Sequence, residues 1–92
     1  MNTYELVIIL TQKISDEEKK ASIVKITELI TANGEVTSVD DMGVKKLAYE
    51  INKEGEGHYY LFNFVATPDH ILELERVLRL DDTVLKYMTI KK

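Results

Sequence analysis

The sequence contains no cysteine and only two histidines among its 92 residues. The absence of cysteine excludes disulfide bonds, thiolate nucleophiles and cysteine-ligated zinc. The histidines, His58 and His70, do not have the HxxxH spacing of a helical zinc site, and the acidic residues do not follow the pattern of a calcium loop. We therefore expect no metal and no cofactor.

The sequence also lacks a long hydrophobic run. No apolar stretch approaches the length that spans a membrane, and the first residues do not have the pattern of a signal peptide. We therefore expect a protein of the cytoplasm that makes no membrane contact. Hydrophobic residues make up 45% of the chain and charged residues 30%, which is typical of a folded protein. The length suits a single domain over residues 1–92, with a core between two layers.

Positive charge is scarce, because 12 basic residues face 16 acidic ones and the net charge is −4. Binding to a phosphate backbone depends on basic side chains, so this balance argues against a nucleic-acid partner. The local placement of lysines can nevertheless override the net charge.

Alternating and helical patterns predict six elements. Residues 4–10 are apolar and β-branched, as in a central strand. Ser15 and Glu18 form a capping box for a helix that ends at Asn33-Gly34, where we expect glycine to adopt a left-handed conformation. Residues 35–51 are extended with a bulge at Gly43, residues 52–57 have the composition of a hairpin loop, and residues 59–67 form a second central strand. A helix follows Thr67-Pro68, and residues 84–90 form the last strand.

The order strand, helix, strand, strand, helix, strand predicts an α+β fold of the ferredoxin-like βαββαβ type. Two right-handed βαβ crossovers then give a four-stranded antiparallel sheet with both helices packed on one face. The helices leave the opposite face of the sheet uncovered. If Tyr60, Phe62, Phe64 and Ala66 point to the helices, the apolar residues on the uncovered face are Val7, Ile9, Tyr59, Leu61 and Val65.

Such an apolar patch on an uncovered sheet predicts a surface for a protein partner. The alternative is that the residues are assigned to the wrong faces of the strand, or that a tail or a neighbouring molecule in a crystal covers the patch. Most lysines fall on the outer strands and their loops, where they could also serve to prevent edge-to-edge pairing of sheets. From the sequence alone we favour this protective role.

Catalysis finds little support in the sequence. The adjacent pairs Asp40-Asp41 and Asp81-Asp82 are typical of turns, and no nucleophile motif lies near His58. We therefore expect neither an enzyme nor a small-molecule substrate.

The residues further resemble a known family, bacterial small-subunit ribosomal protein six. The opening Tyr4-Glu5 is similar to the start of that family, and residues 43–52, GVKKLAYEIN, resemble its most diagnostic stretch, Gly-x-basic-x-Leu-Ala-Tyr-x-Ile. His58-Tyr59-Tyr60 and the segments 72–80 and 84–86 follow in family order, so the likeness covers essentially the whole chain.

The resemblance implies a structural protein of the bacterial ribosome, without enzymatic activity. It implies binding to ribosomal RNA of the central domain together with small-subunit ribosomal protein eighteen, a partner that could supply the missing positive charge. The RNA-binding residues implied in this way are Asn2, Thr3, Tyr4, Lys45, Lys46, Lys53, Lys86, Lys91 and Lys92. The family often has a basic residue where this chain has Asn2, which weakens the expectation for that position.

Tyr49 allows two interpretations. Its ring could stack on a base, or it could fill the core, and we favour the core because Leu47, Tyr49 and Ile51 share one face. A rival function, that of an RNA-recognition-like domain, needs stacking rings on both central strands, but Val7 and Ile9 stand in their place. An acylphosphatase-like enzyme would need an arginine-bearing loop after the first strand, and Thr11-Gln12-Lys13 has none.

Overall fold

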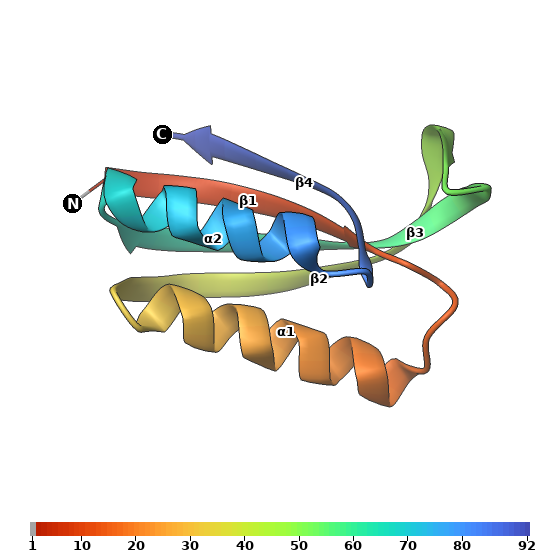
Figure 1. The fold of residues 1–92 in the computed structure, drawn as a ribbon, viewed down its shortest axis with the longest axis horizontal. Coiled ribbons are helices and arrows are strands. Elements are labelled where there is room, and N and C mark those ends of the chain that lie inside the picture. The colour runs from red at the N-terminus through yellow and green to blue at the C-terminus, as the bar shows by residue number, and fades with distance from the viewer. Residues whose placement is uncertain (1) are drawn as a thin grey trace.

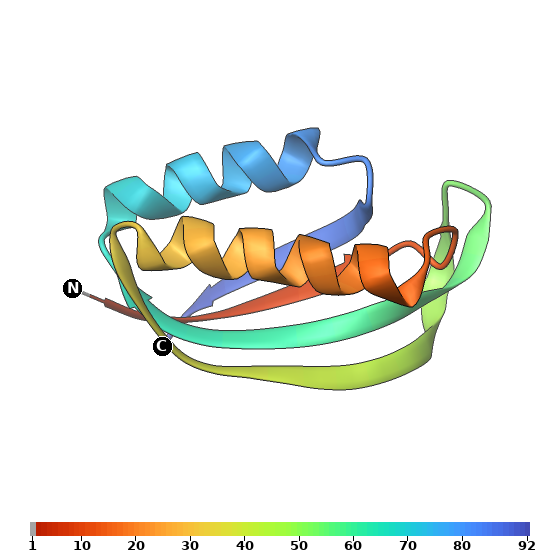
Figure 2. The same ribbon diagram turned by 90° about the horizontal axis from the view of Figure 1, so that it is seen from below.

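A computed structural model of the chain describes residues 2–92. Its strands form one antiparallel sheet in the order β2-β3-β1-β4. Both helices lie on one side of this sheet (Figure 2), so the predicted βαββαβ fold is confirmed. The elements in chain order are β1 (Asn2–Leu10), α1 (Asp16–Thr31), β2 (Gly34–Ile51), β3 (Glu54–Ala66), α2 (Pro68–Leu80) and β4 (Val84–Lys91) (Figure 1).

The core lies between the helices and the two central strands. β1 and β3 pair so that Leu6 is opposite Phe62 and Ile8 is opposite Tyr60. Alternate residues of a strand point to the same face, so these side chains all meet the helices. The apolar stripes of the two helices complete the core with Ile26, Ile30, Ile71, Leu74 and Leu78.

The predicted helix starts are confirmed. The backbone N–H of Glu18 donates to Ser15 Oγ at 3.2 Å, and the backbone N–H of Ser15 donates to Glu18 Oε1 at 3.4 Å, which completes the capping box of α1. α2 begins with Thr67 as its N-cap and Pro68 in its first turn. Proline suits this position because the N–H that it lacks has no partner within the helix.

The expectation for Gly34 is wrong. α1 ends with Ala32 in the right-handed conformation, and Gly34 opens β2 without a positive φ. The glycine is instead required by close packing, because a Cβ at this position would lie 2.2 Å from the carbonyl oxygen of Val65.

Gly34→Ala is therefore expected to lower the free energy of unfolding by about 1–3 kcal/mol, the usual cost of forcing extra atoms into a packed region. The measurement is the urea unfolding midpoint. Gly55→Ala is the matched control, since a Cβ at Gly55 meets nothing within 4 Å. Equal midpoints for the two variants would contradict the close approach.

β2 bends at Gly43, where its register with β3 shifts and φ is +80°. The predicted bulge is confirmed. The predicted loop over residues 52–57 is wrong, because the turn is only Asn52-Lys53, with φ of 50° and 66°, and β3 already begins at Glu54. Two successive positive φ values are typical of a type I′ hairpin turn. The polar composition of this segment reflects a hairpin that projects into solvent, not a long loop.

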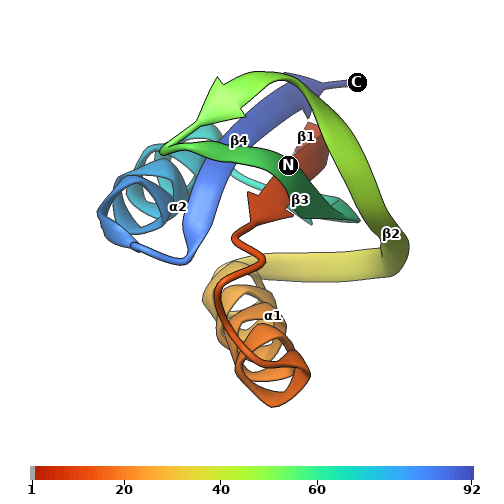
Figure 3. The same cartoon turned by 90° about the vertical axis from the view of Figure 1, so that its right-hand side faces the viewer.

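We call residues 44–56 the hairpin arm. Within it the pairing is irregular, since Lys46 pairs with Glu56 and Ile51 with Glu54. The β2 residues between these pairs, 47–50, therefore stand opposite Gly55 alone. An excess of residues on one strand bends a hairpin, and Figure 3 shows this arm curving over the sheet at its β4 side.

Candidate partner and nucleic-acid interface

The face of the sheet opposite the helices carries an apolar row across three strands. Val7 of β1 pairs with Leu61 on β3 and with Met88 on β4, and Ile90 follows Met88 on the same face. We call Val7, Leu61, Met88 and Ile90 the sheet patch. Val7 and Leu61 are half-buried, whereas Met88 is 43% and Ile90 51% exposed. The patch is apolar where a solvated sheet normally carries polar side chains.

The sequence interpretation missed Met88 and Ile90. Both alternate with Tyr87, which packs against the core. This alternation could have identified them, but which residues of an edge strand point to which face is uncertain until the register with its neighbour is known. The other expected residues, Tyr59 and Val65, do lie on the face away from the helices and are half-buried.

The expectation that Ile9 is available to a partner is wrong. Ile9 points away from the helices, but it is only 4% exposed because the hairpin arm covers it. A Cβ on Gly57 would meet Ile9 Cγ2 at 2.3 Å and Leu47 Cδ2 at 3.6 Å, so glycine permits this close packing. Only a groove of about 190 Å³ remains between arm and sheet, lined in part by Tyr49, Tyr59 and Met88.

Polar side chains border the sheet patch near the chain termini. Lys92 Nζ lies 3.1 Å from Glu5 Oε1 and donates to Asn63 Oδ1 at 3.0 Å. Asn63 Nδ2 donates in turn to Ser38 Oγ at 3.0 Å. On β2, Asp40 is opposite Leu61, so a second carboxylate borders the patch. The patch therefore has an apolar centre and a polar rim, in which the carboxylate of Glu5 is paired with Lys92.

The implied RNA-binding residues fall into two groups at opposite ends of the molecule, whose longest extent is 37 Å (Figure 1). The first group is on the arm and consists of Lys45, Lys46 and Lys53, all exposed. The second surrounds the termini and consists of Asn2, Thr3, Lys91 and Lys92. Lys86 belongs to neither group, since it lies on β4 and its Nζ donates to the hydroxyl of Tyr49 at 3.0 Å.

Two tyrosines differ from expectation. Tyr4, implied as an RNA-binding residue, is only 6% exposed, because its ring stacks on Phe64 with 5.6 Å between centroids. It is a core residue and does not present its ring to RNA. Tyr49, favoured as a core residue, is 61% exposed and lies on the arm within residues 47–50, which oppose Gly55 alone.

A polar network joins α1 to the base of the arm. The ammonium of Lys19, which is 6% exposed, donates to Gln12 Oε1 at 2.5 Å and to His58 Nδ1 at 3.3 Å. An ammonium can only donate, so the ring proton of His58 is on Nε2, which donates to Asp41 Oδ1 at 2.5 Å. The same oxygen accepts the N–H of Gly43 at 2.9 Å. The network thus holds the bend of β2 against the helix.

The hydrogen bond from His58, helped by that from the Gly43 backbone, lowers the pKa of Asp41 below its ordinary value. A carboxylate with a lowered folded-state pKa stabilises the fold above its unfolded pKa, and this stabilisation is lost as the pH falls through the folded value. Asp41→Asn is therefore expected to cost up to about 1 kcal/mol at pH 7, a modest figure because the carboxylate is exposed.

The cost of Asp41→Asn should shrink as the pH falls through the lowered pKa of Asp41, because the wild-type carboxyl then also becomes neutral. Thermal unfolding at pH 7, 4 and 2 measures it. Asp40→Asn is the control, because within residues 2–92 the Asp40 carboxylate has no hydrogen-bond partner. A cost for Asp41→Asn that stays constant with pH would show that the charge is not responsible.

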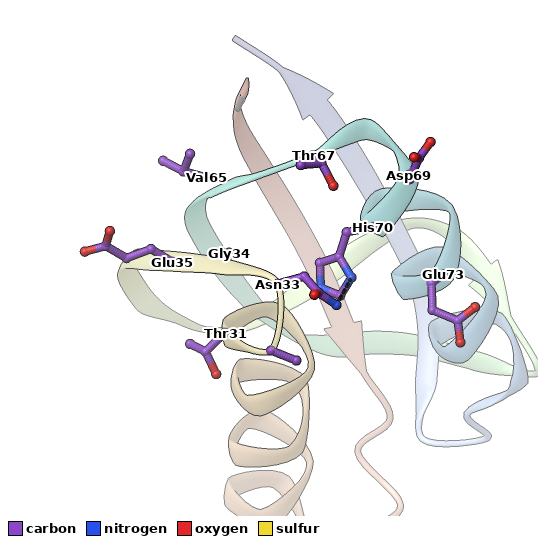
Figure 4. Close-up of a pocket in the computed structure, with 10 residues that line it drawn as sticks. Thr31, Asn33, Gly34, Glu35, Val65, Thr67, Asp69, His70 and Glu73 are labelled. Carbon is purple, nitrogen blue, oxygen red and sulfur yellow. Dashed lines mark hydrogen bonds between the residues drawn. The ribbon is translucent and has the colours of Figure 1, made fainter.

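A cavity of about 850 Å³ lies between the end of α1 and the start of α2 (Figure 4). Its one buried polar group is already satisfied: His70 Nε2 donates to the Leu29 carbonyl at 2.7 Å, and Asn33 Nδ2 lies 3.4 Å from His70 Nδ1. Nearby, Glu73 is paired with Arg76, which lowers the pKa of the Glu73 carboxyl. His70 therefore fastens the two helices together.

Within the described residues, no group of three histidine or acidic side chains could hold a metal ion. The described helices include none that is long and apolar enough to cross a membrane.

The chain is similar to known proteins over nearly its full length. A family model described as ribosomal protein S6 matches residues 3–91. Small ribosomal subunit protein bS6 of an Exiguobacterium species is 47% identical over 92 residues, covering 99% of this chain and 97% of that protein. The bS6 protein of Caldanaerobacter subterraneus is 44% identical with the same coverage. The crystal structure of 30S ribosomal protein S6 from Thermotoga maritima superposes with a TM-score of 0.94 at 27% identity, covering 99% of this chain and 87% of that one.

Proposed function

The chain belongs to the ribosomal protein S6 family of the bacterial small subunit, and from this premise we propose that it binds ribosomal RNA of the central domain together with small-subunit ribosomal protein eighteen. The family is one of structural ribosomal proteins, so we further propose that the chain has no enzymatic activity. Its role is then to position RNA and a second protein.

The observation that carries this proposal is the exposed sheet patch. Protein interfaces commonly have an apolar centre, depleted in charge, and a polar rim. Val7, Leu61, Met88 and Ile90 supply such a centre, and a polar rim is supplied by Glu5, Lys92, Asn63 and Asp40. Asp40, which has no salt-bridge partner within residues 2–92, is the rim residue that favours a basic partner, because complementary charges accelerate association and select the correct protein.

A basic partner also accounts for the net charge of −4. Affinity for RNA depends on the number of phosphates that are neutralised, and the partner supplies most of the required cations. Exposed lysines at the two ends of the folded molecule add contacts to the RNA. With Tyr4 removed, the proposed RNA-binding residues are Asn2, Thr3, Lys45, Lys46, Lys53, Lys86, Lys91 and Lys92.

A binding experiment tests the proposal. A central-domain RNA fragment is titrated with this protein, with protein eighteen, and with both, at 50 and 200 mM salt. We expect feeble binding by this protein alone, tight binding by the pair, and at least tenfold weaker binding of the pair at the higher salt. Equal binding with and without the partner would contradict the role of the sheet patch. Failure of the pair to bind would overturn the proposed function.

A further inference from the structure

Tyr49 lies in the irregularly paired part of the arm and is exposed. It lies within residues 47–50, which oppose Gly55 alone, and its ring is 61% exposed. A large aromatic side chain on an exposed hairpin contributes little to the core. Its position therefore requires another explanation.

The ring is held in place although it is exposed. Lys86 Nζ donates to the Tyr49 hydroxyl at 3.0 Å and lies 5.3 Å from the ring centroid. Lys86 is on β4 and pairs with Ile9 of β1, so this contact ties the tip of the arm to the far edge of the sheet. A ring that is already fixed loses little conformational freedom when it binds a flat ligand.

One lysine lies beside this ring, and another lies beside the ring of Tyr59. Besides Lys86 beside Tyr49, Lys45 Nζ lies 5.8 Å from the ring centroid of Tyr59 on the same side of the sheet. Aromatic rings with adjacent cations are typical of surfaces that bind unpaired nucleic acid, because bases stack on the rings and the cations attract phosphates.

We propose that Tyr49 is a platform on which one unpaired base of the ribosomal RNA stacks, with Lys86 placed to attract the adjoining phosphate. This inference rests on the proposed RNA-binding function and adds to it a stacking residue and the kind of RNA, an unpaired nucleotide. The lysines beside the two rings favour RNA as the occupant, because they can attract its phosphates.

Three variants test the stacking role in the complete complex of RNA and protein eighteen. Removing a stacked ring costs roughly 5- to 150-fold in affinity, so Tyr49→Ala should weaken RNA binding by that factor. Tyr49→Phe keeps the ring and should stay within about threefold of wild type. Val44→Ala, which shortens another exposed apolar side chain of the arm, is the matched control and should leave binding unchanged. Urea midpoints for all three should equal that of wild type.

A fluorescent variant separates RNA from protein contact. The chain has no tryptophan, so Tyr49→Trp introduces a single reporter ring. Stacking of a base should quench its emission when RNA is added to the protein pair, whereas protein eighteen alone should leave the emission unchanged.

The outcomes distinguish the two proposals. If wild type does not bind RNA with its partner, the proposed function fails. If wild type binds and Tyr49→Ala binds equally well, only the stacking inference fails. If Tyr49→Ala weakens binding to protein eighteen in the absence of RNA, or if protein eighteen alone changes the tryptophan emission, the ring contacts protein and the stacking inference is overturned.

Discussion

Leu61→Lys is expected to weaken binding to protein eighteen by at least 100-fold while the protein remains folded. Leu61 belongs to the sheet patch and lies between Val7 and Asp40. A lysine there would have to lose its hydration in an apolar interface, which costs several kcal/mol, and it would neutralise Asp40, the rim charge that favours a basic partner. In the free protein the side chain faces solvent, so folding should be little affected. Calorimetric titration without RNA measures the affinity directly.

Leu72→Lys is the control for Leu61→Lys. Leu72 is 71% exposed on α2, on the side of the sheet that the helices cover, and the substitution makes the same change in composition and charge. Its affinity for the partner should equal that of wild type. If both variants bind like wild type, the partner does not use the sheet patch; if both lose binding equally, net charge is responsible and not position.

Phe62→Ala is expected to lower the free energy of unfolding by about 3–5 kcal/mol. Phe62 is fully buried beneath the helices and opposite Leu6, and truncation of a buried phenylalanine removes its apolar contacts and leaves a cavity. The free energy of unfolding of small domains is only about 5–15 kcal/mol, so the substitution removes a large part of it. Urea unfolding followed by circular dichroism measures it.

Leu61→Ala provides the comparison for Phe62→Ala, because it changes the adjacent residue on the opposite face of β3. Leu61 is only half-buried, and we expect a cost of about 1 kcal/mol or less. Similar costs at positions 61 and 62 would show that β3 does not alternate between a core face and an uncovered face, and the proposed interface would lose its basis.

Local patterns in the sequence determined the elements and their order. The alternation of Tyr60, Phe62 and Phe64 fixed which face of β3 is buried, because successive side chains of a strand point to opposite sides. The capping box at Ser15 and the proline at position 68 fixed the helix starts through hydrogen bonds that form within one turn. The segment 43–52 indicated the family, which the comparisons show.

The tertiary structure decided which residues of the uncovered face are available. The alternation along β1 correctly predicted that Ile9 points to the uncovered face. Only the path of the arm, in which residues 47–50 oppose Gly55, shows that Ile9 is covered. Tyr49 lies in the same irregularly paired segment and is exposed. Gly34 is likewise needed because of Val65, a residue far along the chain. In each case the cause is a contact between distant segments, and its geometry depends on strand register, which alternation along one strand does not contain.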